Sequence, residues 1–159
     1  MKITFKITDI PRWIADQLVR HTVGVHSYMA TSRPDRGGKL RKDQSMEDLT
    51  DLLQSYNAES FINMCNQRLC VGCVSKQTRE TVQLIVEKLN DKEPEIAFFC
   101  VPNCIVYGAC KENAFTKCQH FESYLEFVNR EGNNANALSI LADIDSRYKM
   151  YHKFNATKS

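Results

Sequence analysis

The first residues of the chain alternate between apolar and polar side chains. Ile3, Phe5 and Ile7 lie on one side of an extended chain, and the residues between them are Lys or Thr. A period of two residues predicts a short strand that packs on one face only.

A helical period replaces this alternation after Asp9. Asp9 can cap a helix, and Pro11 is tolerated in the first turn because its missing N–H would have no partner there. Apolar residues then recur at helical spacing from Trp13 onwards. Gly24 ends this helix, and the segment TSRPDRGGKL predicts a turn or loop.

Most of the remaining chain repeats apolar residues at helical spacing. A long helix is predicted from about Ser45 to near Gly72, and Ser75 is a candidate cap for the next one. Three later segments also have a helical pattern: the apolar stretch 95–110, which Pro102 and Gly108 interrupt, then Phe121–Val128 and Leu138–Phe154.

Composition narrows the class of protein. The 159 residues are 43% hydrophobic and 25% charged, which is typical of one ordinary globular core. No apolar run approaches the roughly 18 residues of a membrane span, and the first residues lack a secretory signal. We therefore expect a cytoplasmic protein in which the seven cysteines are reduced rather than paired as disulfides.

The net charge of +2 is too small to indicate nucleic-acid binding, so any anion site must come from local clustering. Residues 17–36, QLVRHTVGVHSYMATSRPDR, contain three arginines, two histidines and several hydroxyls. Guanidinium groups and hydroxyls together are well suited to a phosphate. This stretch predicts an anion site.

A second polar pattern lies in the predicted long helix. Asn57, Ser60, Asn63 and then Gln67 or Arg68 recur every three to four residues, so they share one edge of an otherwise apolar helix. These groups either form part of a binding site or simply cap backbone and contact water, as most polar residues do.

Two ordered segments resemble the flavin-dependent thymidylate synthase family. QLVRH at 17–21 and the Thr-Ser-Arg element at 31–33 are similar to the family's Gln-Leu-Val-Arg-His-Arg run and Ser-x-Arg element. NAESFINMCNQRLC at 57–70 is similar to the family's Asn-x-Arg-Ser helix, which leads to a catalytic arginine. The resemblance covers roughly residues 3–36 and 41–82.

The resemblance implies a function for each matching residue. The positions implied for dUMP are Gln17, Arg20, Thr31, Ser32, Arg33, Arg41 and Arg68, and those for the flavin are His21, Asn57 and Asn63. Thr31, Ser32 and Arg33 would surround the phosphate, with Arg41 as a second phosphate ligand. Arg68 would pair with the pyrimidine ring and activate it, so it is the implied catalytic residue.

The resemblance also implies an architecture and a reaction. The fold would be α+β, with a small antiparallel sheet packed with long helices, and the enzyme would be a homotetramer. It would methylate dUMP to dTMP with methylenetetrahydrofolate as carbon donor, FAD as cofactor and NADPH as hydride donor. We expect a catalytic domain at 1–130, including a Cys-rich segment 100–120, and a C-terminal helical extension at 131–159.

Glu59 departs from the family pattern, because it stands where an arginine would contact the flavin pyrophosphate. A carboxylate close to a pyrophosphate is repulsive, which puts FAD binding in question. Two alternatives therefore stay open: a noncatalytic nucleotide- or nucleic-acid-binding module on the same fold, and a related pyrimidine-nucleotide hydroxymethylase.

The cysteines form a separate candidate site. Cys104, Cys110, Cys118 and His120 follow a C-x5-C-x7-C-x-H spacing, and three thiolates with one imidazole can complete a tetrahedral zinc site. The alternative is that these are free, partly buried thiols, since unpaired cysteine behaves as a small hydrophobe.

Overall fold

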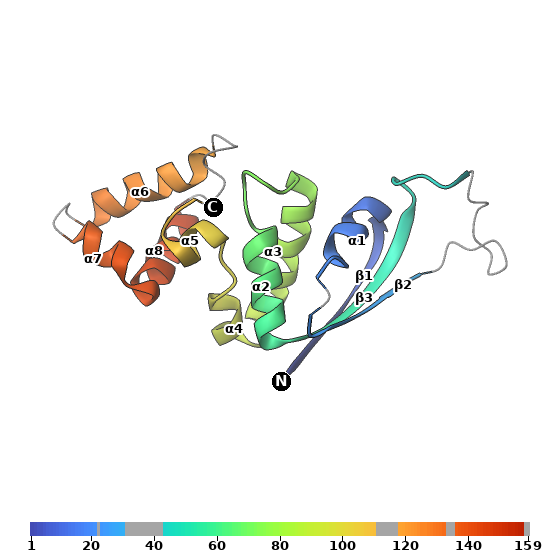
Figure 1. Cartoon of the computed structure of the whole chain (residues 1–159). Coiled ribbons are helices and arrows are strands. Elements are labelled where there is room, and N and C mark those ends of the chain that lie inside the picture. Colours follow the sequence, from blue (N-terminus) through green and yellow to red (C-terminus); the bar gives the residue numbers. More distant parts are fainter. Residues whose placement is uncertain (22, 31–42, 111–117, 133–135, 158–159) are drawn as a thin grey trace. The chain divides into compact units, whose positions relative to one another are not determined.

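The computed structural model describes residues 1–21, 23–30, 43–110, 118–132 and 136–157. It is an α+β structure with a three-stranded antiparallel sheet and several helices (Figure 1). The elements in chain order are β1 (Lys2–Pro11), α1 (Arg12–Leu18), β2 (Val25–Met29), β3 (Leu49–Asn57), α2 (Ala58–Arg68), α3 (Lys76–Asn90), α4 (Pro94–Phe98), α5 (Asn103–Tyr107), α6 (Gln119–Glu131), α7 (Ala137–Ala142) and α8 (Ile144–Ala156). Two compact units, Met1–Met64 and Cys65–Ser159, divide the chain within α2.

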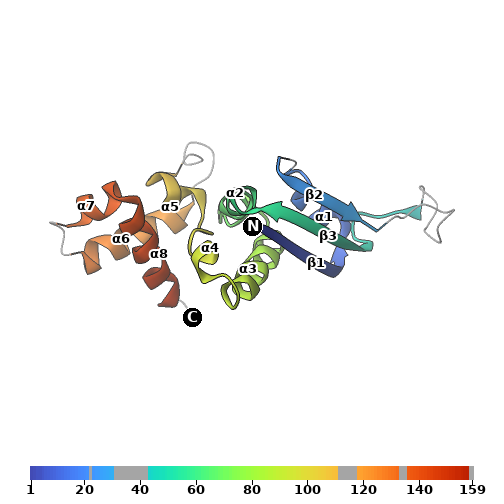
Figure 2. The same ribbon diagram turned by 90° about the horizontal axis from the view of Figure 1, so that it is seen from below.

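The first unit is built on the sheet, whose strand order is β1-β3-β2 (Figure 2). Ile3 of β1 and Val25 of β2 are both paired with Tyr56 of the central strand. Tyr56 is fully buried, stacks on Phe5 with ring centroids 5.8 Å apart and contacts Phe61 edge-on. The core of this unit is therefore the sheet face that carries Tyr56.

The predicted strand at the start of the chain is confirmed, but it is longer than expected. β1 continues through Asp9, which has a φ of 56° beside the irregular pairing between Ile7 and Ile10. Pro11, rather than Asp9, is the N-cap of α1. The helix also ends at Leu18, earlier than the predicted end at Gly24.

The predicted long helix from Ser45 is wrong over its first part, because residues 49–57 form the strand β3. Leu52, Gln54 and Tyr56 are buried at a period of two. The buried position in the middle holds a glutamine, so the apolar residues of this segment also fit a helical period. The edge strand β2 was not predicted, and it has no alternation of buried and exposed residues.

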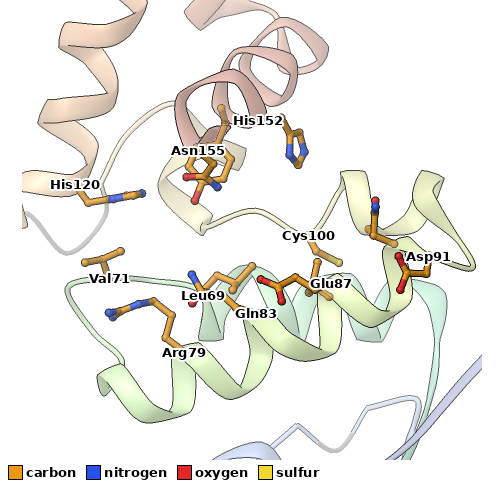
Figure 3. A pocket seen from close by; sticks show the side chains of 14 residues that line it. Leu69, Val71, Arg79, Gln83, Glu87, Asp91, Cys100, His120, His152 and Asn155 are labelled. Carbon is orange, nitrogen blue, oxygen red and sulfur yellow. The ribbon is translucent and has the colours of Figure 1, made fainter. Parts of the chain in front are cut away.

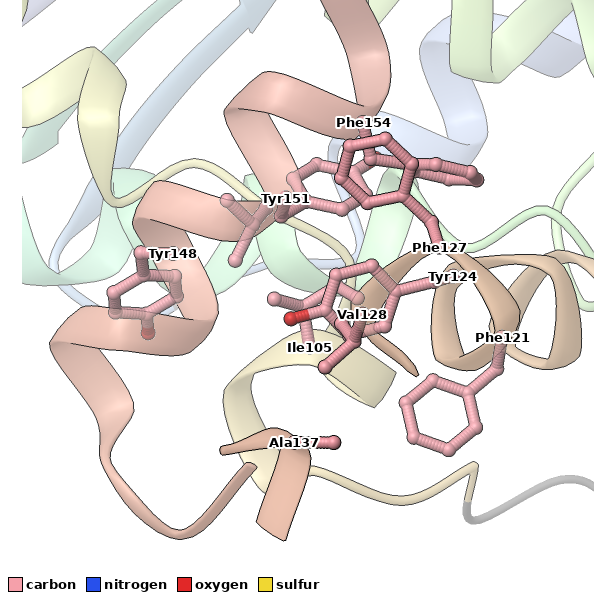
Figure 4. Packing of buried hydrophobic residues seen from close by; sticks show 10 residues of the cluster. Ile105, Phe121, Tyr124, Phe127, Val128, Ala137, Tyr148, Tyr151 and Phe154 are labelled. Carbon is pink, nitrogen blue, oxygen red and sulfur yellow. The ribbon is translucent and has the colours of Figure 1, made fainter. Parts of the chain in front are cut away.

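The second unit is helical. Its core is formed mainly by aromatic side chains from α6 and α8 (Figure 4). The predicted helix at Phe121–Val128 lies within α6, and Ser75 caps α3 by accepting a hydrogen bond from the Thr78 N–H. The predicted helix Leu138–Phe154 is instead two helices, because Asp143 interrupts it and caps α8 through the Ser146 N–H at 2.7 Å.

Arg147 is a buried cation that connects three segments of this unit. Its guanidinium donates to the carbonyl oxygens of Ile105 at 2.9 Å and Val106 at 2.8 Å, and also to that of Leu141. The Tyr124 hydroxyl donates in turn to the Arg147 carbonyl at 3.1 Å. Arg147 thus satisfies carbonyl groups of α5 and α7 that are left without helical partners.

No helix within the described part of the chain is long and apolar enough to cross a membrane.

We predict that Arg147→Met lowers the free energy of unfolding by about 3 kcal/mol or more, because it leaves one buried and two partly buried carbonyl groups without this donor. Urea unfolding followed by circular dichroism measures this change. Arg130→Met is the matched control: Arg130 is exposed, pairs with Glu131 and lies over the Phe127 ring. Its loss should cost less than about 1 kcal/mol. Equal losses in the two variants would contradict the importance of the buried contacts.

Candidate functional site

A buried amide side chain holds the end of α1 in place. Gln54 of β3 is fully buried, and its amide nitrogen donates to Ser27 Oγ at 2.9 Å and to the Leu18 carbonyl at 3.4 Å. Its amide oxygen has no hydrogen-bond partner among the described residues. Gln54 therefore joins the end of α1, where the QLVRH segment lies, to β2.

The predicted binding residues of QLVRH lie at the end of α1. Gln17 is half-buried in the last turn, Arg20 is exposed just after it, and His21 is half-buried. The His21 N–H donates to the Leu18 carbonyl at 3.4 Å. Arg20 is therefore accessible to a ligand, while His21 is partly covered by the rest of the protein.

The segment after His21 packs against the start of α2. The Asn57 N–H donates to the Gly24 carbonyl at 3.2 Å, and the Ser60 hydroxyl donates to the Val23 carbonyl at 2.7 Å. Gly24 has a φ of +68°, and a Cβ there would lie 2.3 Å from Asn57 Nδ2. The two segments that carry the predicted site are therefore in direct contact, and a glycine is needed where they meet.

The polar edge of α2 is partly structural. Asn57 Oδ1 accepts a hydrogen bond from the Ser60 N–H at 2.8 Å, which is the contact of a helix N-cap. Asn63 and Gln67 are exposed on the same helix. The interpretation of this row as caps and water-facing groups is thus right for the Asn57 oxygen, whereas the exposed Asn63 is accessible to a ligand.

Glu59 has a structural reason for its place in the sequence. It lies exposed in the first turn of α2. A carboxylate is favourable there because the helix N-terminus carries a partial positive charge. An exposed side chain at this position can also turn towards solvent, away from an anionic ligand.

A concavity of about 520 Å³ lies in the first unit where these segments meet. Met1, Lys2, Gly24, His26, Ser55, Tyr56 and Asn57 line it. Lys2 is paired with Asn57 across the sheet, and His26 is paired with Ser55. The concavity therefore offers an ammonium group, an imidazole and an amide, which suits a polar or anionic ligand. Sequence reasoning missed Lys2 and His26, because only strand pairing brings them to Asn57.

The remaining predicted dUMP residues are placed differently. Arg68 is the last residue of α2, where a cation is favourable, and it belongs to the second unit. Thr31, Ser32, Arg33 and Arg41 lie outside the described residues.

The second unit has a larger pocket of about 790 Å³, which sequence reasoning did not find (Figure 3). Arg79, Gln83 and Glu87 of α3 line it at intervals of four residues, so all three are on one helix face. His152 lies on the opposite side of the pocket from them. Its ring stacks on Phe98 and forms a hydrogen bond with the Phe98 carbonyl at 2.9 Å. The regular spacing on α3 was a possible signal, but an exposed polar helix face has the same pattern.

None of the seven cysteines forms a disulfide bond. Within the described residues, no three His, Cys, Asp or Glu side chains form a group that could hold a metal ion as they stand. The ring of His120 contacts Tyr151 and Phe154 edge-on, and this residue also lines the larger pocket.

Comparisons with protein-family models, with curated proteins and with solved structures find no match.

We predict that Gly24→Ala displaces the Asn57 side chain and removes the cap of α2. A cap is worth about 1 kcal/mol, so exchange of the Ser60 amide hydrogen should become about fivefold faster. Gly108→Ala is the matched control, because Gly108 has a similar φ of +66° but its nearest Cβ contact is an ordinary 3.4 Å. An unchanged Ser60 exchange rate in Gly24→Ala would show that Asn57 does not depend on this glycine.

Proposed function

We propose that this chain is a compact flavin-dependent thymidylate synthase that methylates dUMP with methylenetetrahydrofolate, FAD and NADPH. The proposal includes the thymidylate synthase-like fold, a homotetramer and action in the cytoplasm. It rests on the resemblance of two segments to that family, and on how those segments pack.

The observation that carries the proposal is the contact between the segment after QLVRH and the start of α2. The resemblance by itself concerns two segments that are far apart in the sequence, and it does not say whether they meet in space. The Asn57 N–H donates a hydrogen bond to the Gly24 carbonyl, and the Ser60 hydroxyl donates one to the Val23 carbonyl. The two segments are therefore neighbours within the first unit. A nucleotide-binding site assembled from both segments requires this proximity.

The residues at this contact fit a flavin. Gly24 brings the backbone close to Asn57 with no space for a side chain between them, and the adjoining concavity carries Lys2 and His26. The Lys2 ammonium group can balance the negative charge of a pyrophosphate, and the His26 imidazole can donate a hydrogen bond to it. The exposed Glu59 does not have to face that charge. When bound, FAD would supply hydride transfer.

The protein's own residues would bind and polarise the substrate. Arg20 is exposed beside the flavin residues, where it can contact the nucleotide. Arg33 and Arg41 are the proposed phosphate ligands from the resemblance. Arg68 would hold the uracil carbonyl edge with its planar fork and stabilise negative charge that develops on the ring, so that C5 becomes nucleophilic without an enzyme thiol.

Exposed apolar side chains on the first unit support an oligomer. Tyr28, Leu49 and Leu53 lie on the strands β2 and β3 and are 68%, 63% and 40% exposed. Tyr28 and Leu53 are direct cross-strand partners, so they form one patch. Such a patch is suited to burial against another subunit.

We predict that Asn63→Ala weakens FAD binding up to about tenfold, the effect of losing one hydrogen bond. Flavin fluorescence during titration of the full-length apo protein measures the affinity. Gln67→Ala is the matched control, since Gln67 is equally exposed one turn further along α2 and has no proposed contact with the flavin. Equal affinities in the two variants would contradict the assignment of Asn63. Failure of the wild type to bind FAD would favour the noncatalytic alternative.

We predict that Arg68→Lys keeps the dUMP affinity within about tenfold but lowers turnover at least about 100-fold. A point charge preserves attraction to the nucleotide but cannot reproduce the bidentate contact on the ring. Calorimetry gives the affinity, and dTMP formation gives the rate. Arg130→Lys, which alters an exposed arginine of α6, should leave both unchanged. Normal turnover in Arg68→Lys would exclude its catalytic role.

A further inference from the structure

The proposed function makes no use of the larger pocket of the second unit. This pocket has a volume of about 790 Å³ and lies between one face of α3 and residues of α6 and α8 (Figure 3). Pockets that hold small organic ligands typically have volumes of about 300–1,000 Å³. The side chains on its walls indicate which class of ligand fits it.

Opposite charges occupy the two ends of the α3 wall. Arg79 lies in the first turn of the helix, Glu87 lies in its last turn, and Asp91 is its C-cap residue. All three line the pocket. Among the residues that the structure describes, Arg79 and Glu87 form no ion pair with another side chain. The pocket therefore has a positive end and a negative end.

This order of charges is unfavourable for the helix itself. A helix N-terminus carries a partial positive charge and the C-terminus a partial negative charge, so carboxylates are favoured in the first turn and cations in the last. Arg79 and Glu87 are placed the other way round. The stability of α3 therefore does not explain these two charges, whereas that of α2 does explain Glu59 in its first turn.

The other walls supply apolar surface and hydrogen-bonding groups. Leu69 and Tyr151 are buried, so part of the lining is apolar. The Phe98 carbonyl can only accept, so His152 Nε2 carries the proton in their hydrogen bond and Nδ1 of the neutral ring remains an acceptor. Asn155 lies three residues further along α8, and its amide both donates and accepts. A ligand with donors and acceptors along an apolar body, such as a peptide, matches these groups.

The separation of the two charges limits the length of the ligand. Glu87 follows Arg79 by eight residues, which places their Cα atoms about 12 Å apart along the helix axis, at about 1.5 Å per residue. An extended peptide spans at most about 3.3–3.6 Å per residue, so about three or four residues cover this distance. A single amino acid is too short to reach both groups.

We propose that this pocket binds a short extended peptide of about three or four residues with both termini free. Its C-terminal carboxylate pairs with Arg79, because a planar guanidinium holds a carboxylate with two parallel hydrogen bonds. Its N-terminal amino group pairs with Glu87, and Asp91 extends the negative end of the pocket. The proposal concerns the second unit alone and does not rest on the proposed function.

Tetraalanine is a suitable probe for the full-length protein, because this peptide is charged only at its termini. We expect millimolar tetraalanine to shift the nuclear magnetic resonance signals of α3 and α8 amides, and calorimetry gives its affinity. Acetylation of its amino group and amidation of its carboxylate should each weaken binding at least about tenfold, since each removes one charge-assisted contact. No shift with tetraalanine, or an unchanged affinity of either blocked peptide, would overturn the proposal.

Glu87→Gln tests the negative end, and Glu80→Gln is its matched control. Glu80 is an exposed carboxylate of the same helix, pairs with Lys76 at 3.7 Å and is not part of the pocket lining. Glu87→Gln should weaken tetraalanine binding at least about tenfold, whereas Glu80→Gln changes the net charge equally and should leave the affinity unchanged. Equal affinities in the two variants would contradict the role of Glu87.

Arg79→Gln tests which end of the peptide lies where. This variant should weaken binding of free tetraalanine at least about tenfold but leave that of the amidated peptide unchanged, because the amidated peptide has already lost the contact with Arg79. An equal loss for both peptides would overturn the assigned direction of the chain.

Stability separates a binding role of Glu87 from a structural one. Its carboxylate lies near the C-terminal end of α3, so Glu87→Gln should not lower the urea concentration at the unfolding midpoint. A variant that unfolds more easily and binds tetraalanine like the wild type would assign Glu87 to the fold and overturn its role in the site. The comparison of free and blocked peptides uses the wild type, so it decides the proposal however the variants fold.

Discussion

The central strand β3 is the constraint on which the first unit depends. Both other strands pair with it, and it continues into α2 with no loop between Asn57 and Ala58. Asn57 therefore pairs with Lys2 across the sheet, holds the Gly24 segment through its N–H and caps α2 with its side chain. One residue fixes the start of the helix relative to the sheet and to the segment after QLVRH.

In the second unit, buried polar contacts fix how the segments of the chain pack together. Aromatic residues of α6 and α8 supply most of the apolar burial, but such rings can pack in several ways. Arg147 and Asn66 require particular partners: Arg147 binds three carbonyl groups, and buried Asn66 accepts a hydrogen bond from the Val101 N–H at 3.1 Å. An unsatisfied buried group is costly, so these contacts select one arrangement of the backbone.

Exposure separates the polar residues that maintain the fold from those that remain available for binding. Gln54 is fully buried and joins α1 to β2, whereas Arg20 and Asn63 are exposed. Glu59 is exposed in a position where the helix N-terminus already favours a carboxylate. Its place in the sequence thus has a structural reason that does not depend on any cofactor.

The sequence by itself determined the elements whose burial follows a simple period: the alternation of β1, the Ser75 cap of α3 and the apolar face of α6. It also pointed to QLVRH and to residues 57–70 as candidate site segments. It failed at β3, because Gln54 occupies a buried position that a periodic pattern reserves for an apolar residue. Only the tertiary structure decided which segments meet: Gly24 with Asn57, and Asn66 with Val101. Such contacts join residues far apart in the chain, and local periodicity carries no information about them.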